Sequence, residues 1–122
     1  MRRILATLAV VALLFSAGSA WADFDDGVAA YERGDYATAL QEWLPLAEKG
    51  DTDAQYNLGL MYGKGDGVPV NNVRAYMWWS LAKAQGHENA ADNLNIVKNE
   101  MTPAQIAKAQ ELATKMWKKI NN

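Results

Sequence analysis

Residues 54–86 read AQYNLGLMYGKGDGVPVNNVRAYMWWSLAKAQG and contain one complete helix–loop–helix unit. Apolar residues recur every three or four positions in the first third of this stretch, and Gly59 among them allows a second helix to approach closely. The glycine-rich run 63–67 ends this helix, and Asn71 is a suitable N-cap for the next one, which stops at Gly86. The stretch therefore predicts a helical hairpin, and the rest of the chain is read from it.

Parts of the same pattern recur at an offset of 36 residues. The matching pairs are Ala39 with Ala75, Trp43 with Trp79, Gly50 with Gly86, Ala54 with Ala90, Asn57 with Asn93, and Leu58 with Leu94. Self-similarity at a period in the thirties is typical of stacked helical hairpins. We therefore predict an all-α fold of about three hairpins: a half-repeat at 24–50, a complete repeat at 51–86, and a degenerate repeat plus capping helix at 87–120.

The central unit resembles the Sel-one-like repeat (SLR) family, whose members are relatives of the tetratricopeptide repeats. The resemblance rests on Ala54, Leu58, Gly59, Tyr62, Gly65, Gly67, Val68, Asn71, Ala75, Trp78, Ala82 and Gly86. It implies a short right-handed α-α superhelix that binds proteins or peptides on its concave side, is often exported and is rarely catalytic. Two positions depart from the family pattern, because Glu42 replaces its Trp in the first copy and Asn95 replaces its Gly in the third.

The first 22 residues have the three parts of a cleavable signal peptide. A basic start precedes an apolar run at 4–15, and Ala20, Trp21 and Ala22 fit the small-x-small cleavage rule. The apolar run is shorter than the roughly 20 residues that a membrane-spanning helix needs. We therefore expect cleavage after Ala22, no stable membrane insertion, and a helical repeat domain at 23–122 that is periplasmic or secreted.

The charge of the mature chain argues against nucleic acid as a partner. Arg2 and Arg3 leave with the signal peptide, so ten basic side chains remain against fourteen acidic ones, a net charge of −4. Nonspecific binding to nucleic acid depends mainly on lysine and arginine against phosphate. The sequence also contains no cysteine, so the domain is expected to hold together by packing alone.

The sequence predicts neither a catalytic site nor a bound metal or cofactor. His87 is its one histidine, and without cysteine the usual soft metal-ligand sets are missing. Ser80, the one serine after residue 22, lacks the glycines of a nucleophile elbow, and His87 is expected to cap a helix. The run 63–67 lacks the strand and the Gly-Lys-Ser/Thr ending of a phosphate loop, so we interpret it as a left-handed turn.

We predict an interaction module for a protein or peptide of the cell envelope. The candidate contact residues are Tyr56, Asn57, Met61, Tyr76, Trp78 and Asn93. Trp78 has two interpretations: it packs on the 62–67 region of its own unit, or it is a partly exposed anchor of a binding face. Two other functions remain open. One is a small hydrolase acting on cell-wall glycan or peptide, and the other is a ligand-binding module whose aromatic side chains stack on a sugar or lipid.

Overall fold

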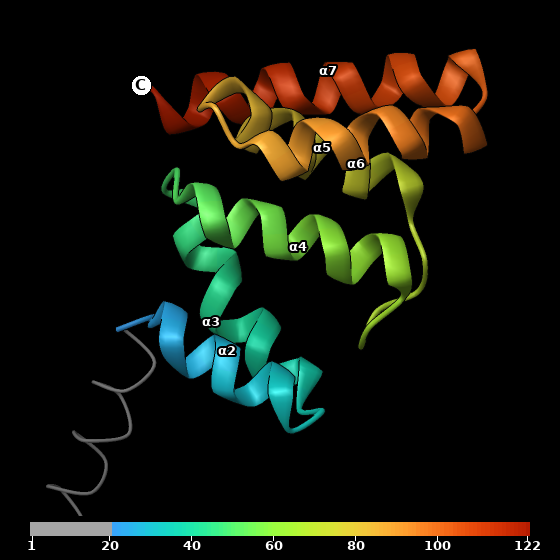
Figure 1. Ribbon diagram of the computed structural model, residues 1–122. Coiled ribbons are helices and arrows are strands. Elements are labelled where there is room, and N and C mark those ends of the chain that lie inside the picture. Colours follow the sequence, from blue (N-terminus) through green and yellow to red (C-terminus); the bar gives the residue numbers. More distant parts are fainter. Residues whose placement is uncertain (1–20) are drawn as a thin grey trace, which may run out of the picture.

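The computed structural model describes residues 21–122, so the predicted signal peptide lies outside the described residues except for Trp21 and Ala22. Within this part of the chain every regular element is a helix and no strand occurs (Figure 1). The elements are α2 (Phe24–Glu32), α3 (Tyr36–Glu48), α4 (Thr52–Lys64), α5 (Asn72–Ala84), α6 (Glu88–Val97), the short 3-10 helix η1 (Lys98–Glu100) and α7 (Pro103–Ile120). The prediction of an all-α fold of helical hairpins is confirmed.

Polar side chains fix where the helices begin. In each case the side chain of the preceding residue accepts a hydrogen bond from a backbone N–H of the first turn, which would otherwise lack a partner. The capping residues of α2 to α7 are Asp23, Asp35, Asp51, Asn71, His87 and Thr102. Thr102 and Gln105 also form the reciprocal capping box that the sequence indicates.

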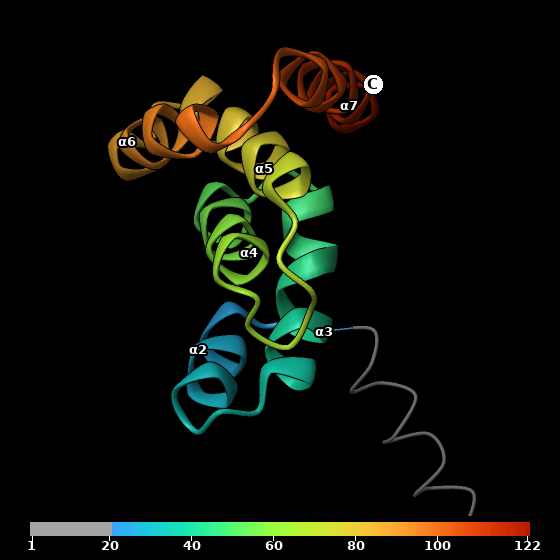
Figure 2. The same ribbon diagram turned by 90° about the vertical axis from the view of Figure 1, so that its right-hand side faces the viewer.

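The helices stack in chain order, with one exception at the end. α2 packs on α3 and α4 on α5, and α3–α4 and α5–α6 contacts join the successive hairpins. Figure 2 shows α2, α4 and α6 along one side of the molecule, which we call the inner face. α3 and α7 lie on the other side, which we call the outer face. α7 packs against α5 rather than against α6, its neighbour in sequence.

Each of the first two hairpins is closed by a glycine and a tryptophan. The indole of Trp79 lies against Gly59 where a Cβ atom would stand, and the indole of Trp43 lies against Gly27 in the same way. The indole N–H of Trp79 donates to the carbonyl of Tyr56 at 3.2 Å, and that of Trp43 donates to the carbonyl of Phe24 at 3.1 Å. A glycine is required at both positions because any side chain would displace the ring.

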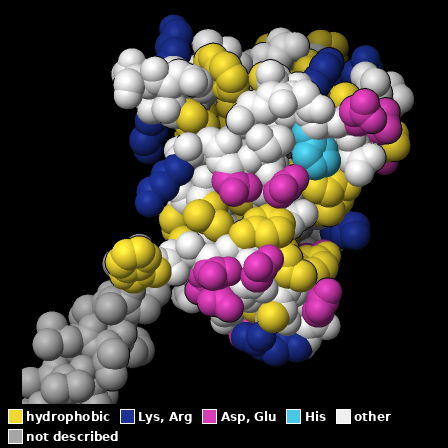
Figure 3. Space-filling view, turned by 60° about the vertical axis from the view of Figure 1, so that its left-hand side comes forward, with side chains coloured by type: hydrophobic (Ala, Val, Ile, Leu, Met, Phe, Trp, Pro, Cys, Tyr) yellow, Lys and Arg dark blue, Asp and Glu magenta, His cyan; other side chains and the backbone are white. Residues whose placement is uncertain are grey.

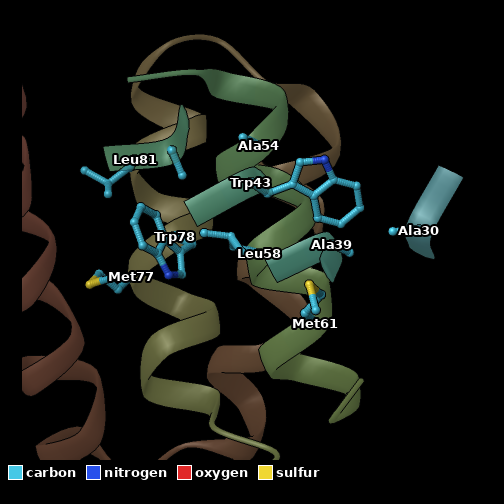
Figure 4. Close-up of a cluster of buried hydrophobic side chains, with 10 residues drawn as sticks. Ala30, Ala39, Trp43, Ala54, Leu58, Met61, Met77, Trp78 and Leu81 are labelled. Carbon is cyan, nitrogen blue, oxygen red and sulfur yellow. The ribbon is translucent and has the colours of Figure 1, made fainter. Parts of the chain in front are cut away.

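The core continues through both hairpins without a break. Figure 4 shows Trp43 of α3, Leu58 of α4 and Trp78 of α5 in one buried cluster. Gln55 is the one buried polar or charged residue among residues 21–122. Its Nε2 donates to the carbonyl of Ala47 at 3.1 Å, and its Oε1 accepts from Gln85 at 2.9 Å. These bonds satisfy the amide and connect α3, α4 and the end of α5.

Candidate binding site on the inner face

The inner face carries two grooves, one on each side of α4. The first lies between α2 and α4, has a volume of about 300 Å³, and is lined by Val28, Tyr31, Glu32, Trp43, Asn57 and Leu60. The second lies between α4 and α6 and has a volume of about 220 Å³. Its lining includes Leu60, Gly63, Lys64, Trp79, Asn93, Ile96 and Glu100. Leu60 belongs to both grooves, so it stands at the centre of the inner face.

The two grooves are copies of each other. Residues of α2 correspond to residues of α4 at an offset of 32, and the later positions correspond at 36. With these offsets every lining residue of the first groove has its counterpart in the second: Val28 and Leu60, Tyr31 and Gly63, Glu32 and Lys64, Trp43 and Trp79, Asn57 and Asn93, Leu60 and Ile96. The hairpin repeat therefore produces a repeated surface, as expected where the same supersecondary unit stacks on itself.

The copies differ at two positions that a ligand would meet. Tyr31 fills part of the first groove where Gly63 leaves the second open, and the acidic Glu32 is replaced by the basic Lys64. An apolar residue occupies the equivalent position of each inner helix: Val28, Leu60 and Ile96. It is most exposed on α6, where Ile96 is 63% exposed. The inner face thus combines an apolar ridge with a reversal of charge along it.

Asn57 and Asn93 lie where the sequence indicates, one in each groove. Both are partly exposed, so their amides are accessible from the inner face. The amide of Asn93 donates to the hydroxyl of Tyr56 at a long 3.5 Å, which leaves most of its hydrogen-bonding capacity unused. These two residues are the part of the predicted site that the structure places on an open surface.

Tyr56 is only partly buried and has a structural role as well. Its ring stacks on the imidazole of His87, with centroids 4.4 Å apart and the planes 17° from parallel. His87 caps α6, since its Nδ1 accepts from the N–H of Ala90 at 3.1 Å, and its Nε2 lies 3.7 Å from a carboxylate oxygen of Asp53. The predicted capping role of His87 is confirmed, and Tyr56 supports that cap from α4.

Three of the predicted contact residues are buried. Met61 is 0%, Trp78 2% and Tyr76 8% exposed. The interpretation of Trp78 as a partly exposed anchor is therefore wrong. The physical reason is α7, which covers α5 on the outer face and brings Leu112 and Met116 against the cluster that contains Trp78. Glu42, at the equivalent position of α3, is partly exposed and accepts from the backbone N–H of Asp23 at 2.8 Å.

The loop between α4 and α5 is a docked turn. Gly65 and Gly67 have positive φ angles of 78° and 73°, as the glycine run predicts. The hydroxyl of Tyr31 donates to the carboxylate of Asp66 at 2.5 Å, which attaches the loop to α2. This hydrogen bond, together with burial and the charge of Asp66, raises the pKa of Tyr31 to about 12.

Ser80 and His87 are each engaged in local backbone contacts. The hydroxyl of Ser80 donates to the carbonyl of Tyr76 on the same helix at 2.7 Å, while His87 holds the α6 cap. Among residues 21–122, no three His, Cys, Asp or Glu side chains are grouped so that they could hold a metal ion. Likewise, no helix in the described part of the chain has the length and apolarity to cross a membrane.

Charge is distributed unevenly over the molecule. Figure 3 shows acidic side chains gathered over the lower half, around the first helices, and lysine and arginine mainly around the upper half. This agrees with the order of charges along the chain, since Asp25, Asp26 and Glu32 belong to α2 and Lys115 and Lys119 to α7. An elongated ligand on the molecule therefore meets opposite fields at its two ends.

Comparison with known proteins finds the same repeat. Residues 52–87 match the family described as Sel1 repeat. The exopolysaccharide production negative regulator of Rhizobium meliloti (strain 1021) is 32% identical over 78 residues, which are 64% of this chain and 29% of that protein.

Two proteins described as alginate biosynthesis protein AlgK are also similar. The protein from Azotobacter vinelandii is 27% identical over 74 residues, which are 61% of this chain and 16% of that protein. The protein from Pseudomonas aeruginosa is 32% identical over 66 residues, which are 54% of this chain and 14% of that protein. The matched segments therefore span less than a third of the length of each of these relatives.

Proposed function

Because this chain is a helical repeat protein of the Sel1 kind, we propose that it is an exported, non-catalytic interaction module that binds a protein or peptide of the cell envelope on its inner face. Export is inferred from the basic, apolar and small-x-small segments of residues 1–22. The binding surface is the one formed by α2, α4 and α6. The observation that carries the proposal is the pair of equivalent grooves on either side of α4.

The two grooves suit an extended peptide or a protruding loop. Each groove offers an apolar wall, an indole floor that is already fixed by its own hydrogen bond, and one asparagine amide. An amide supplies both a donor and an acceptor, so Asn57 and Asn93 can each pair with a peptide unit of the ligand. Two apolar side chains of the ligand, one in each groove, would then provide the main anchoring contacts.

The charged residues of the grooves give the ligand a direction. Glu32 lines the first groove, whereas Lys64 lines the second together with Glu100. A segment with a basic residue near α2 and an acidic residue near Lys64 fits this order, and the reversed segment places like charges together. Juxtaposed like charges disfavour the wrong orientation, so the inner face selects the sense in which the chain lies.

Leu60→Glu is the variant that tests this function, because Leu60 contributes to both grooves. Partners are captured from envelope extract on immobilised wild type, Leu60→Glu, Asn57→Ala and the matched control Lys108→Glu, which changes an exposed charge on α7. We expect a partner that Lys108→Glu retains, that Asn57→Ala weakens and that Leu60→Glu loses. Equal recovery of that partner by Leu60→Glu and wild type would exclude the inner face as the binding surface.

A further inference from the structure

A pocket larger than either inner groove lies on the outer face. It has a volume of about 390 Å³ and opens between α3, α5 and α7. We call it the outer pocket. Its walls are mainly apolar and come from Leu44 of α3, Met77 of α5, and Leu112 and Met116 of α7. Its size is at the lower end of the range of small-molecule sites in proteins.

One donor that is buried in the wall of the outer pocket lacks a partner. Trp78 lines the pocket and is 2% exposed, and its indole Nε1 is the one buried side-chain nitrogen or oxygen among residues 21–122 without a hydrogen bond. The indoles of Trp43 and Trp79, by contrast, donate to backbone carbonyls. A buried polar group without a partner is costly, and native structures keep few of them.

The orientation of Trp78 directs this donor away from the top of the cluster. In Figure 4 the indole nitrogen of Trp78 lies on the edge of the ring that faces away from Leu81. Because an indole N–H can only donate, the group that satisfies it must be an acceptor. A ligand of the outer pocket that pairs with Trp78 must therefore carry a hydrogen-bond acceptor.

The charges around the outer pocket favour an anion. Arg74, Lys115 and Lys119 line it against a single carboxylate, that of Glu48. The guanidinium of Arg74 lies over the ring of Tyr62, 5.8 Å from its centroid, so it is held on the same side as the aromatic wall. An acceptor that is also an anion is, in its simplest form, a carboxylate.

We propose that the outer pocket binds a small amphipathic monocarboxylic acid, such as a medium-chain fatty acid. Its carboxylate is attracted by the basic side chains and accepts the indole N–H of Trp78 after the side chains that cover this nitrogen move aside, while its chain lies against the two leucines and two methionines. Methionine side chains are flexible and polarisable, so such walls adapt to a chain of variable conformation. This site does not depend on the proposed function of the inner face.

Decanoate and 1-decanol form a matched pair of probes, because they share the apolar chain and differ in the carboxylate. Each is titrated below its aggregation concentration into the ¹⁵N-labelled protein, and the indole N–H resonances are followed by NMR. Decanoate is expected to move the Trp78 resonance saturably and to leave those of Trp43 and Trp79 in place, whereas decanol, which is an acceptor without a charge, should bind more weakly and move Trp78 less. An unmoved Trp78 resonance, or an equal response to both probes, would overturn the proposal.

Three variants locate the binding. Trp78→Phe keeps a ring but removes the donor, which assigns the resonance and should weaken decanoate binding roughly 10-fold or more. Met116→Trp narrows the pocket from the partly exposed α7 and should abolish binding.

Lys119→Glu changes an exposed side chain, so folding is unaffected. It should weaken decanoate binding several-fold, and the residual affinity should depend little on added salt. Leu60→Glu, the inner-face variant, should bind decanoate as wild type does.

The outcomes separate the two surfaces. Undiminished decanoate binding by both Met116→Trp and Lys119→Glu would place the ligand elsewhere and reject the outer pocket. Loss of decanoate binding in Leu60→Glu would place it in the inner grooves and reject the outer pocket as well. Neither result bears on whether a protein partner binds the inner face, which the capture experiment measures independently.

Discussion

The first two hairpins and the last pair of helices, α6 and α7, differ in how their helices pack. In α2–α3 and in α4–α5, a glycine of the first helix receives the indole of the second, and the two helices lie close together. In the third unit Asn95 takes the place of Gly59, and Trp117 of α7 is 39% exposed and lies beside Leu81 of α5. The glycine–tryptophan pair is therefore present in the two hairpins whose helices pack on each other and is missing from α6 and α7, which do not.

Without this pair, α7 lies along α5 instead of α6. Figure 2 shows α6 and α7 on opposite sides of α5. This displacement has two consequences for function. It buries Trp78 under α7 and creates the outer pocket between α3, α5 and α7. It also leaves the apolar ridge of the inner face uncovered at its end, where Ile96 is mostly exposed.

The largest expected effect comes from removing a tryptophan from a closed hairpin. Trp79→Ala deletes the ring that fills the space beside Gly59 and the hydrogen bond to Tyr56. It should lower the free energy of unfolding by about 3–5 kcal/mol, as for other buried large-to-small changes. Urea denaturation measures the loss. Trp117→Ala on the open α7 is the control and should cost under about 1 kcal/mol; similar losses for both would contradict the distinction between the units.

The same substitution should have opposite signs at two repeat-related positions. At Gly59, alanine places a Cβ where the Trp79 indole lies, and the resulting displacement of a rigid ring should outweigh the gain of about 1 kcal/mol in helix propensity. The expected net loss is about 2 kcal/mol. At Asn95, which is exposed, alanine has only the propensity gain, up to about 0.5 kcal/mol. Urea denaturation curves of the two variants measure both values, and a loss at Asn95 as large as that at Gly59 would refute the role of the close approach.

Local sequence signals were enough to predict where the helices lie in the chain, but not which helices pack on one another. The capping residues, such as Asp51 and Thr102, act within one turn of the backbone they satisfy, so the sequence shows where most helices begin. Asn57 and Asn93 were found because they share the main period of the repeat. Trp78 was different, because its burial depends on a helix that lies some thirty residues later in the chain and packs out of sequence order.

Gly27 was missed for a simpler reason. The connection between α2 and α3 is four residues shorter than that between α4 and α5, so Gly27 corresponds to Gly59 at an offset of 32 instead of 36. A search at a single period therefore overlooks the first glycine and the groove beside it. A second search at an offset of 32 residues pairs Gly27 with Gly59 and Val28 with Leu60, and it would have found the equivalence. Gln55 has no such signal, since its partners are a backbone carbonyl and a side chain at the end of another helix.

The contact between the first two hairpins should contribute less to the free energy of unfolding than the packing within each hairpin. Gln55→Leu keeps the volume of the buried side chain but leaves the carbonyl of Ala47 without its side-chain donor. This carbonyl still accepts from the backbone N–H of Gly50 at 3.0 Å, so the expected loss is that of one hydrogen bond, about 1.5 kcal/mol. Gln85→Leu leaves the Oε1 of the buried Gln55 without its donor and should cost about 1 kcal/mol. Urea denaturation curves of both variants that coincide with the wild-type curve would show that Gln55 does not connect the hairpins in the way described.

The smallest effect is expected where α2 meets the loop of the central hairpin. Tyr31→Phe removes the hydrogen bond to Asp66 and should cost about 1 kcal/mol near neutral pH. Because the pKa of Tyr31 is about 12 in the folded protein, against about 10 in an unfolded chain, the folded state holds this proton more tightly. Its contribution is therefore complete below pH ~10 and is lost as the pH rises from ~10 through ~12.

Two measurements check this contact. In urea denaturation above pH ~10, wild type should lose stability more steeply than Tyr31→Phe, because only wild type holds the late-ionising phenol. In an ultraviolet titration of tyrosinate, Asp66→Asn should bring the pKa of Tyr31 back toward its ordinary value, since the hydrogen bond to the carboxylate and the negative charge that opposes ionisation are both gone. Parallel pH profiles for wild type and Tyr31→Phe would mean that the loop is held without Tyr31. In that case the glycine–tryptophan contacts, with the packing of α3 on α4, are sufficient to hold the first hairpin against the second.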